Sequence, residues 1–148
     1  MELAAPASLR TEHDELHREL AAATKLTGPV GEAARIVAKL LHPHFIDEEA
    51  FALPPLGLLA AVARGEPIEK PAPVVAMTDR LRAELPRMLA EHRAITAALR
   101  ELESAARAAG DEARAHLAEK IIAHARTEEE VMYPAAILVG EFLKRAHR

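Results

Sequence analysis

The sequence predicts an all-α fold, an up-down-up-down antiparallel four-helix bundle, on three observations. Half of its 148 residues are hydrophobic but only 3% are aromatic. This composition favours closely packed helices over a β-sandwich, which needs β-branched and aromatic strands. Apolar residues recur in steps of three and four along four segments, which is the spacing of one helix face. Short turns join these segments in pairs, and short connections make antiparallel neighbours. The length predicts one domain, residues 1–148.

The first two helices are predicted on either side of the turn TGPVG. The first is expected over about residues 8–25, and its apolar face runs through Leu9, position 13, Leu16 and Leu20. The second opens near Pro29, because proline suits the first turn of a helix. Its apolar face runs through Val30, Ala34, Val37, Leu41, positions 44 and 48, and Phe51.

A stretch rich in proline and glycine, residues 53–73, is expected to connect the second and third helices, with GLLAAVA inside it as a short extra helix. The third helix has its face at Leu81, Leu85, Met88, position 92, Ile95, Leu99, Leu102 and Ala106. The fourth begins after Gly110 with Asp111 as its N-cap. Its face runs through Leu117, Ile121, positions 124 and 128, Val131, Ala135 and Leu138.

The numbered positions in these faces hold polar side chains: His13, His44, Glu48, His92, His124 and Glu128. They belong to a repeat, because HFIDEEAFALP from residue 44 matches HARTEEEVMYP from residue 124, and EHDEL from residue 12 matches EHRAI from residue 91. Each half of the chain is therefore a helical hairpin. Residues equidistant from a tight turn lie at equal height, because each helix rises about 1.5 Å per residue. All six side chains are expected in one interior layer.

This layer predicts a metal site. Burying an ionised carboxylate is costly even after relaxation, whereas imidazole and carboxylate are good ligands for iron, manganese or zinc. The residues of each HxxxE pair point the same way on a helix. Six protein ligands are too many for one tetrahedral zinc and suit two metals joined by Glu48 and Glu128. The alternative is a buried His–Glu network without metal.

Other polar residues lie beside this layer. Glu49 and Glu129 are about 100° round the helix from the first glutamates and are expected on the flank, where one can accept a hydrogen bond from an imidazole N–H or replace its neighbour as ligand. His17 follows His13 by one turn and can join the shell. Tyr133 is expected to be an ordinary, partly buried tyrosine, and the alternative is that it closes the pocket or forms a hydrogen bond with a bound ligand. Solvent exposure is expected for His42, His116 and His147.

Composition excludes several classes of protein. The chain has no cysteine, which rules out disulfides and thiolate metal sites and fits cytoplasmic residence. The start MELAAPASLR has no pattern of a secretory signal, and no apolar run approaches the ~20 residues of a membrane span. A net charge of −4 without a basic block argues against nucleic-acid binding.

The phrases EHDELHREL, HPHFIDEEAFALPPL, EHRAITAALREL and HARTEEEVMYPA resemble, in order, the four helices of the hemerythrin-like, HHE cation-binding family, over roughly residues 9–138. The resemblance implies a four-helix bundle that holds a non-haem di-iron centre. It carries the family's ligand positions onto His13, His44, Glu48, His92, His124 and Glu128.

The chain departs from the oxygen-carrying members of that family in two places. They have two histidines four residues apart on the third helix, whereas here Met88 precedes His92 and Thr96 follows it. Their fourth-helix carboxylate also follows its histidine by a longer gap. The resemblance therefore implies an iron position that reacts with oxygen, peroxide or nitric oxide, in place of reversible oxygen transport.

These patterns lead to one main functional prediction and two alternatives. The main prediction is a cytoplasmic di-iron protein that binds, senses or reacts with oxygen, peroxide or nitric oxide, with zinc or manganese as the other metals that fit. One alternative is iron storage or donation, as in iron–sulfur cluster repair. The other is a metal-free helical interaction module that uses GLLAAVA or a bundle face to bind a protein partner.

Overall fold

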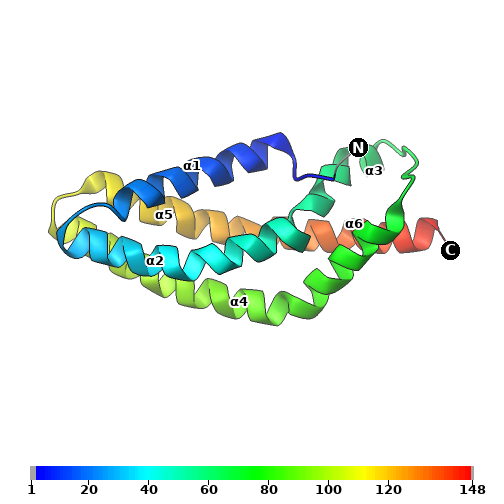
Figure 1. The fold of residues 1–148 in the computed structure, drawn as a ribbon. Helices are drawn as coiled ribbons and strands as arrows, with labels where there is room; N and C mark the ends of the chain where they lie inside the picture. Colours follow the sequence, from blue (N-terminus) through cyan, green and yellow to red (C-terminus); the bar gives the residue numbers. More distant parts are fainter. Residues whose placement is uncertain (1–2, 148) are drawn as a thin grey trace.

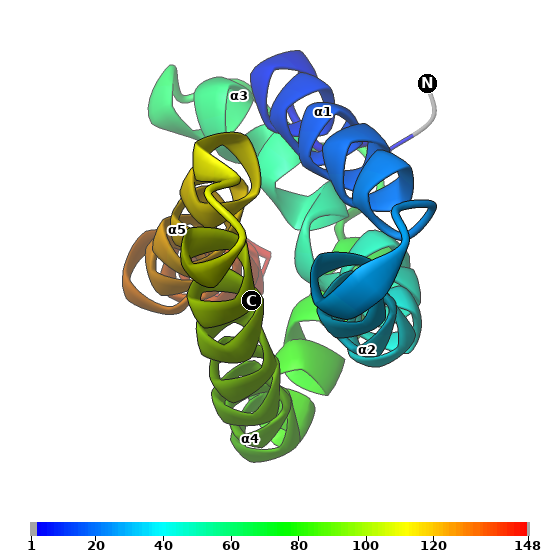
Figure 2. The ribbon, with the colours of Figure 1, turned by 90° about the vertical axis from the view of Figure 1, so that its left-hand side faces the viewer.

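The computed structural model describes residues 3–147, and within that range every regular element is a helix (Figure 1). The long helices are α1 (Ala7–Ala23), α2 (Gly28–Asp47), α4 (Pro71–Ala108), α5 (Glu112–Thr127) and α6 (Tyr133–Ala146). Seen end-on, α1, α2, α4 and α5 surround a common interior (Figure 2). The predicted all-α four-helix bundle is therefore confirmed.

Two tight turns set the relative heights of the helices, and both lie at the same end of the bundle, on the left of Figure 1. Gly28 (φ 79°) and Gly110 (φ 70°) adopt the left-handed backbone conformation, which costs glycine little because it has no Cβ. Asp111 caps α5 as predicted, since its Oδ1 accepts a hydrogen bond from the Arg114 N–H at 3.2 Å.

Both helices that carry an HxxxE phrase widen into a π-helix at the glutamate: η1 (Glu48–Ala52) and η3 (Glu128–Met132). The N–H groups of Leu53 and Tyr133 bond the carbonyls of Glu48 and Glu128, five residues back. A proline follows each π-turn, Pro54 and Pro134. Its ring would clash with the carbonyl four residues back in a regular helix, and the wider turn removes this clash. The sequence repeat is therefore also a repeat of backbone shape.

The second π-turn makes part of the predicted fourth helix face wrong. Val131 and Leu138 were expected inside but are 58% and 66% exposed. The buried residues beyond Glu128 are Met132, Tyr133, Ala136, Val139, Gly140 and Leu143. A π-turn holds one extra residue, so the apolar face moves one position along the chain.

The connector contains the predicted short helix. The helical part of the connector is a 3₁₀ segment, η2 (Pro54–Leu58), followed by α3 (Leu59–Ala63). The connector is shorter than expected, because residues 71–73 form the first turn of α4, with Pro71 at its start. No helix within residues 3–147 combines the length and the hydropathy needed to cross a membrane.

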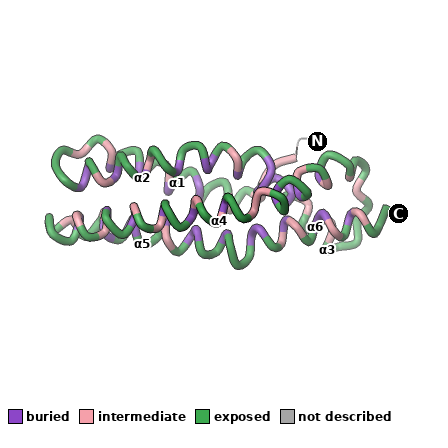
Figure 3. The backbone as a smooth tube through the Cα atoms, turned by 90° about the horizontal axis from the view of Figure 1, so that it is seen from below, coloured by how far each residue is buried: buried purple, intermediate pink, exposed green. Residues whose placement is uncertain are grey.

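The buried residues face inward along every long helix (Figure 3). They form a large apolar cluster towards the tight turns, which includes Leu41, Ile95 and Ile121, and a second cluster towards the connector, which includes Phe51 and Met88. The buried histidines of α2, α4 and α5 lie where the first cluster gives way to the second along each helix. One polar layer therefore separates these two clusters, and a third, small cluster of Val74, Val139 and Leu143 joins α4 to α6.

Candidate metal centre

The structure brings together all six side chains that the sequence predicts as metal ligands. They come from four helices and are nearly inaccessible to solvent. Their exposed fractions are 0% for Glu48, 1% for His44, 2% for His92 and Glu128, 5% for His13 and 6% for His124. Such burial of imidazoles and carboxylates requires partners for each polar atom.

Glu128 is shared by two groups of donor atoms, within each of which the atoms lie no more than 4.8 Å apart. The first group is His44, Glu48, His92 and Glu128, and the second is His13, His124 and Glu128.

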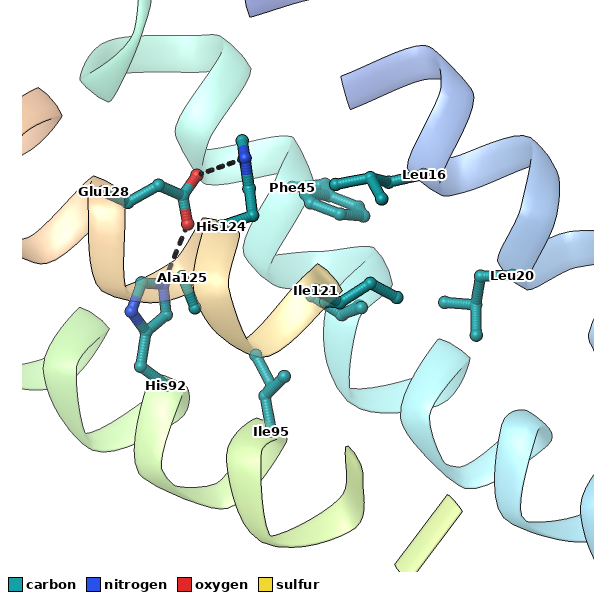
Figure 4. Close-up of a pocket in the computed structure, with 10 residues that line it drawn as sticks. Leu16, Leu20, Phe45, His92, Ile95, Ile121, His124, Ala125 and Glu128 are labelled. Carbon is teal, nitrogen blue, oxygen red and sulfur yellow. Dashed lines mark ion pairs between the residues drawn. The ribbon is translucent and has the colours of Figure 1, made fainter. Parts of the chain in front are cut away.

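The two carboxylate oxygens of Glu128 face different histidines. Oε1 lies 3.3 Å from His92 Nε2. Oε2 lies 3.3 Å from His13 Nε2 and 3.5 Å from His124 Nε2. Figure 4 shows the contacts with His92 and His124. One carboxylate thus reaches both groups.

Glu48 belongs to the first group only. Its Oε1 lies 3.5 Å from His44 Nε2, and its Oε2 accepts a hydrogen bond from the Tyr133 hydroxyl at 2.9 Å. The structure therefore distinguishes the two glutamates, which sequence reasoning treated alike.

Several buried atoms of the layer are arranged as they would be around a cation. Glu48 Oε1 and His124 Nε2 have no hydrogen-bond partner among the described residues, and each such atom costs about 1–3 kcal/mol. The Nε2 atoms of His44 and His92 face one another at 2.8 Å. Two imidazole lone pairs at this distance need a proton or a metal ion between them. The donor set and its unsatisfied atoms therefore fit divalent metal ions.

Three glutamates on the outside of the layer hold histidines in place. Each accepts a hydrogen bond from a histidine Nδ1–H: Glu91 from His44 at 2.9 Å, Glu129 from His92 at 2.9 Å and Glu12 from His124 at 2.7 Å. These bonds leave Nε2 as the nitrogen that faces the layer, as a metal ligand requires. Glu129 is one of the two flank glutamates for which the sequence left this role open. Glu12 and Glu91 were missed, although the repeated dipeptide Glu-His was a signal.

Tyr133 is buried more deeply than the sequence predicts. It is 0% exposed, because the π-turn at residues 128–132 rotates it inward. Its hydroxyl lies 3.3 Å from His44 Nε2 and 3.2 Å from His92 Nε2. Burial raises the pKa of Tyr133, and the charges of Glu128 and Glu48 raise it further. The side chain therefore remains a hydrogen-bond donor.

The two central glutamates have opposite protonation behaviour. Burial raises the pKa of Glu48 well above its usual value, and the negative charge of Glu128 adds to this. Burial acts on Glu128 in the same direction, but its interactions with Glu48 and with His124, His13 and His92 outweigh it and hold the pKa of Glu128 well below the usual value. Without metal, one proton on Glu48 thus relieves the repulsion between the two acids.

The remaining histidines lie outside both donor groups. His17 is half-buried, its ring centroid is 3.6 Å from that of Phe45, and its Nε2 has no partner among residues 3–147. Burial lowers the pKa of His17, and the neighbouring His13 lowers it further. The histidines expected in solvent are indeed exposed: His42, His116 and His147.

A small cavity of about 10 Å³ adjoins the layer on the side of the tight turns (Figure 4). Its walls are mostly aliphatic and aromatic, and His92, His124 and Glu128 line one edge. This is the space of about one water molecule.

The comparisons with known proteins agree with this geometry. The model of the hemerythrin HHE cation binding domain matches residues 5–136. No curated protein and no solved structure matched the chain. The matched range includes every residue of the polar layer, and the buried histidines and glutamates supply a donor set for a cation. The chain therefore belongs to the hemerythrin HHE cation-binding domain family and is a metal-binding helical bundle.

Proposed function

We propose that the chain, folded as one domain, holds two iron ions as a di-iron centre in the cytoplasm and binds, senses or reacts with oxygen, peroxide or nitric oxide. The observation that carries this proposal is the position of Glu128, whose two oxygens face separate sets of histidines. A carboxylate between two donor groups is the arrangement by which helical bundles pair metals.

Each donor group would hold one ion. His44, Glu48 and His92 would hold the first, His13 and His124 the second, and Glu128 would join both. The second group has one fewer protein donor, so it leaves more positions for an external ligand. This difference supports reactivity over closed, structural binding. Zinc or manganese would also accept these donors.

The bound pair of iron ions would supply the electrons and the open positions that chemistry with oxygen, peroxide or nitric oxide needs. The protein's own residues do the rest. Glu12, Glu91 and Glu129 fix the direction of three imidazoles. Tyr133 offers an O–H donor inside the first group. The apolar clusters on both sides keep bulk water from the layer.

Iron storage or donation is the second candidate function, and the weaker holding of the second group supports it. His13 has no hydrogen bond from Nδ1 to a carboxylate within residues 3–147, unlike His44, His92 and His124. A less constrained ligand would release its ion more easily.

Titration of the metal-free protein with ferrous iron under anaerobic conditions tests the proposal. We expect two iron ions per chain by elemental analysis and new ultraviolet and visible absorption on addition of air or nitric oxide. Two bound ions without any spectral change would contradict the reactivity. Rapid transfer of that iron to a metal-free acceptor would then support donation. A metal-free interaction module would be supported if the chain purified from its native host carried no metal and its free energy of unfolding did not change on addition of a chelator.

A further inference from the structure

A second, larger pocket joins the surface to one edge of the polar layer. Its volume is about 240 Å³, and it lies between residues 3–5, α1 and η1. His13, only 5% exposed, forms its inner part. Arg10, Asp14 and Glu49, which are exposed residues, line its outer part. The pocket therefore leads from solvent to one candidate ligand of the second donor group.

The pocket lies where the repeat would place a fourth carboxylate–imidazole pair. In the second half of the chain, Glu129 accepts a hydrogen bond from His92. The corresponding residues of the first half are Glu49 and His13. Within residues 3–147 the one hydrogen bond of His13 joins its Nε2 to Glu128, and both His13 and Glu49 line the pocket. The absence of this pair leaves the layer open on this side.

The other three histidines of the polar layer have their outer ring nitrogen already hydrogen-bonded. His44, His92 and His124 each have a glutamate on Nδ1. On the His44 side, the charge of Glu91 is further balanced by Arg87, whose Nη1 lies 2.8 Å from Glu91 and whose Nη2 lies 3.0 Å from Asp47. A cation that approached there would meet an arginine and an occupied carboxylate.

We propose that the pocket between α1 and η1 is the uptake route for divalent metal ions, with Asp14 and Glu49 as the outer contacts and His13 as the first interior ligand. The inference rests on the proposed metal centre. Carboxylates attract a hydrated cation and raise its local concentration. An imidazole at the inner end then replaces water in its coordination shell, and Glu128 lies 3.3 Å beyond that imidazole. Among residues 3–147, Arg10 is the one positive charge that lines the pocket and opposes uptake.

The rate of metal uptake by the metal-free full-length chain tests this route. The probe is cobalt(II), whose visible absorption reports binding to imidazole and carboxylate, followed by rapid mixing. We expect Asp14→Asn and Glu49→Gln each to slow uptake several-fold and Arg10→Gln to accelerate it. The differences should shrink as salt is added, because screening weakens steering. The final number of ions per chain should stay that of the wild type, because none of the three residues belongs to a donor group.

Glu15→Gln is the matched control, because it removes the same charge from the adjacent exposed position of α1 and does not line the pocket. An equal slowing by Glu15→Gln would overturn the proposal, since net charge alone would then explain the rate. Unchanged uptake in both Asp14→Asn and Glu49→Gln, with two ions still bound, would overturn the route and leave the proposed centre intact. A wild-type chain that binds no ion would instead reject the centre itself.

Discussion

The hydroxyl of Tyr133 donates a hydrogen bond to Oε2 of Glu48 across 2.9 Å, and both side chains are fully buried. Glu48 belongs to the first half of the sequence repeat and Tyr133 to the second, and the tyrosine hydroxyl meets the first donor group at this glutamate. This contact depends on the π-turn at residues 128–132, which brings Tyr133 to the interior. The contact thereby joins Tyr133, directly after the second π-turn, to Glu48, the candidate ligand at the start of the first π-turn.

Tyr133→Phe should destabilise the metal-free protein by about 1–3 kcal/mol, because it leaves a buried acceptor on Glu48 without a partner. Two metal ions should still bind, since the hydroxyl belongs to neither donor group. Denaturant unfolding followed by circular dichroism measures the first effect, and elemental analysis the second. An unfolding free energy equal to that of the wild type would show that the contact has no energetic role.

Glu128→Ala should remove both metal ions, because Glu128 is the one residue common to the two donor groups. Glu48→Ala should weaken the first ion most, since Glu48 belongs to the first donor group only. Metal content per chain after dialysis gives the answer. His42→Ala is the control, because His42 is exposed on the same helix. Loss of metal in His42→Ala would disprove the assignment of helix faces.

Glu91→Ala should lower metal affinity by about 10–100-fold, because His44 then loses the acceptor that fixes its Nδ1–H. Glu91→Gln should restore part of this loss, since its amide oxygen can accept the same hydrogen bond. Competition with a chelator of known affinity measures both variants. Equal losses in the two variants would indicate that charge, and not orientation of the imidazole, is what Glu91 contributes.

Metal binding should raise the thermal stability of the chain. Any ligand that binds only the folded state adds stability that grows with its concentration, about 2.7 kcal/mol at 100 times the Kd. The bound ions would also satisfy Glu48 Oε1 and His124 Nε2, which are otherwise buried without partners. Thermal unfolding with and without a chelator checks this. A thermal unfolding midpoint that does not change when metal is added would be inconsistent with a site in the core.

The polar layer was predictable from the sequence because it interrupts an otherwise regular apolar pattern. A histidine such as His92 within a face of leucine and isoleucine has few explanations other than burial with a partner. The sequence repeat then indicated that the polar side chains lie at the same height along the bundle. The family match covers these same positions.

Other features could not be read from that pattern. Periodicity assumes 3.6 residues per turn, so one π-turn was enough to place Val131 and Leu138 inside and to leave Tyr133 only partly buried in the prediction. Glu12 and Glu91 were missed for a different reason. They lie on outward positions of their own helices, and their partners, His124 and His44, are on other helices. The repeated Glu-His dipeptide marked both glutamates, but the partner of each could be identified only in the assembled bundle.

The paired π-turns have a consequence for how the bundle can respond to its ligands. Each begins at a central glutamate, so the helical phase changes along two helices at the depth of the polar layer. The apolar cluster on one side of the polar layer therefore packs in a different helical register from the cluster on the other side, and the two registers meet at the layer. Binding or loss of a metal ion in the layer would change how these two clusters fit together, and α6, which follows the second π-turn directly, would turn with that change.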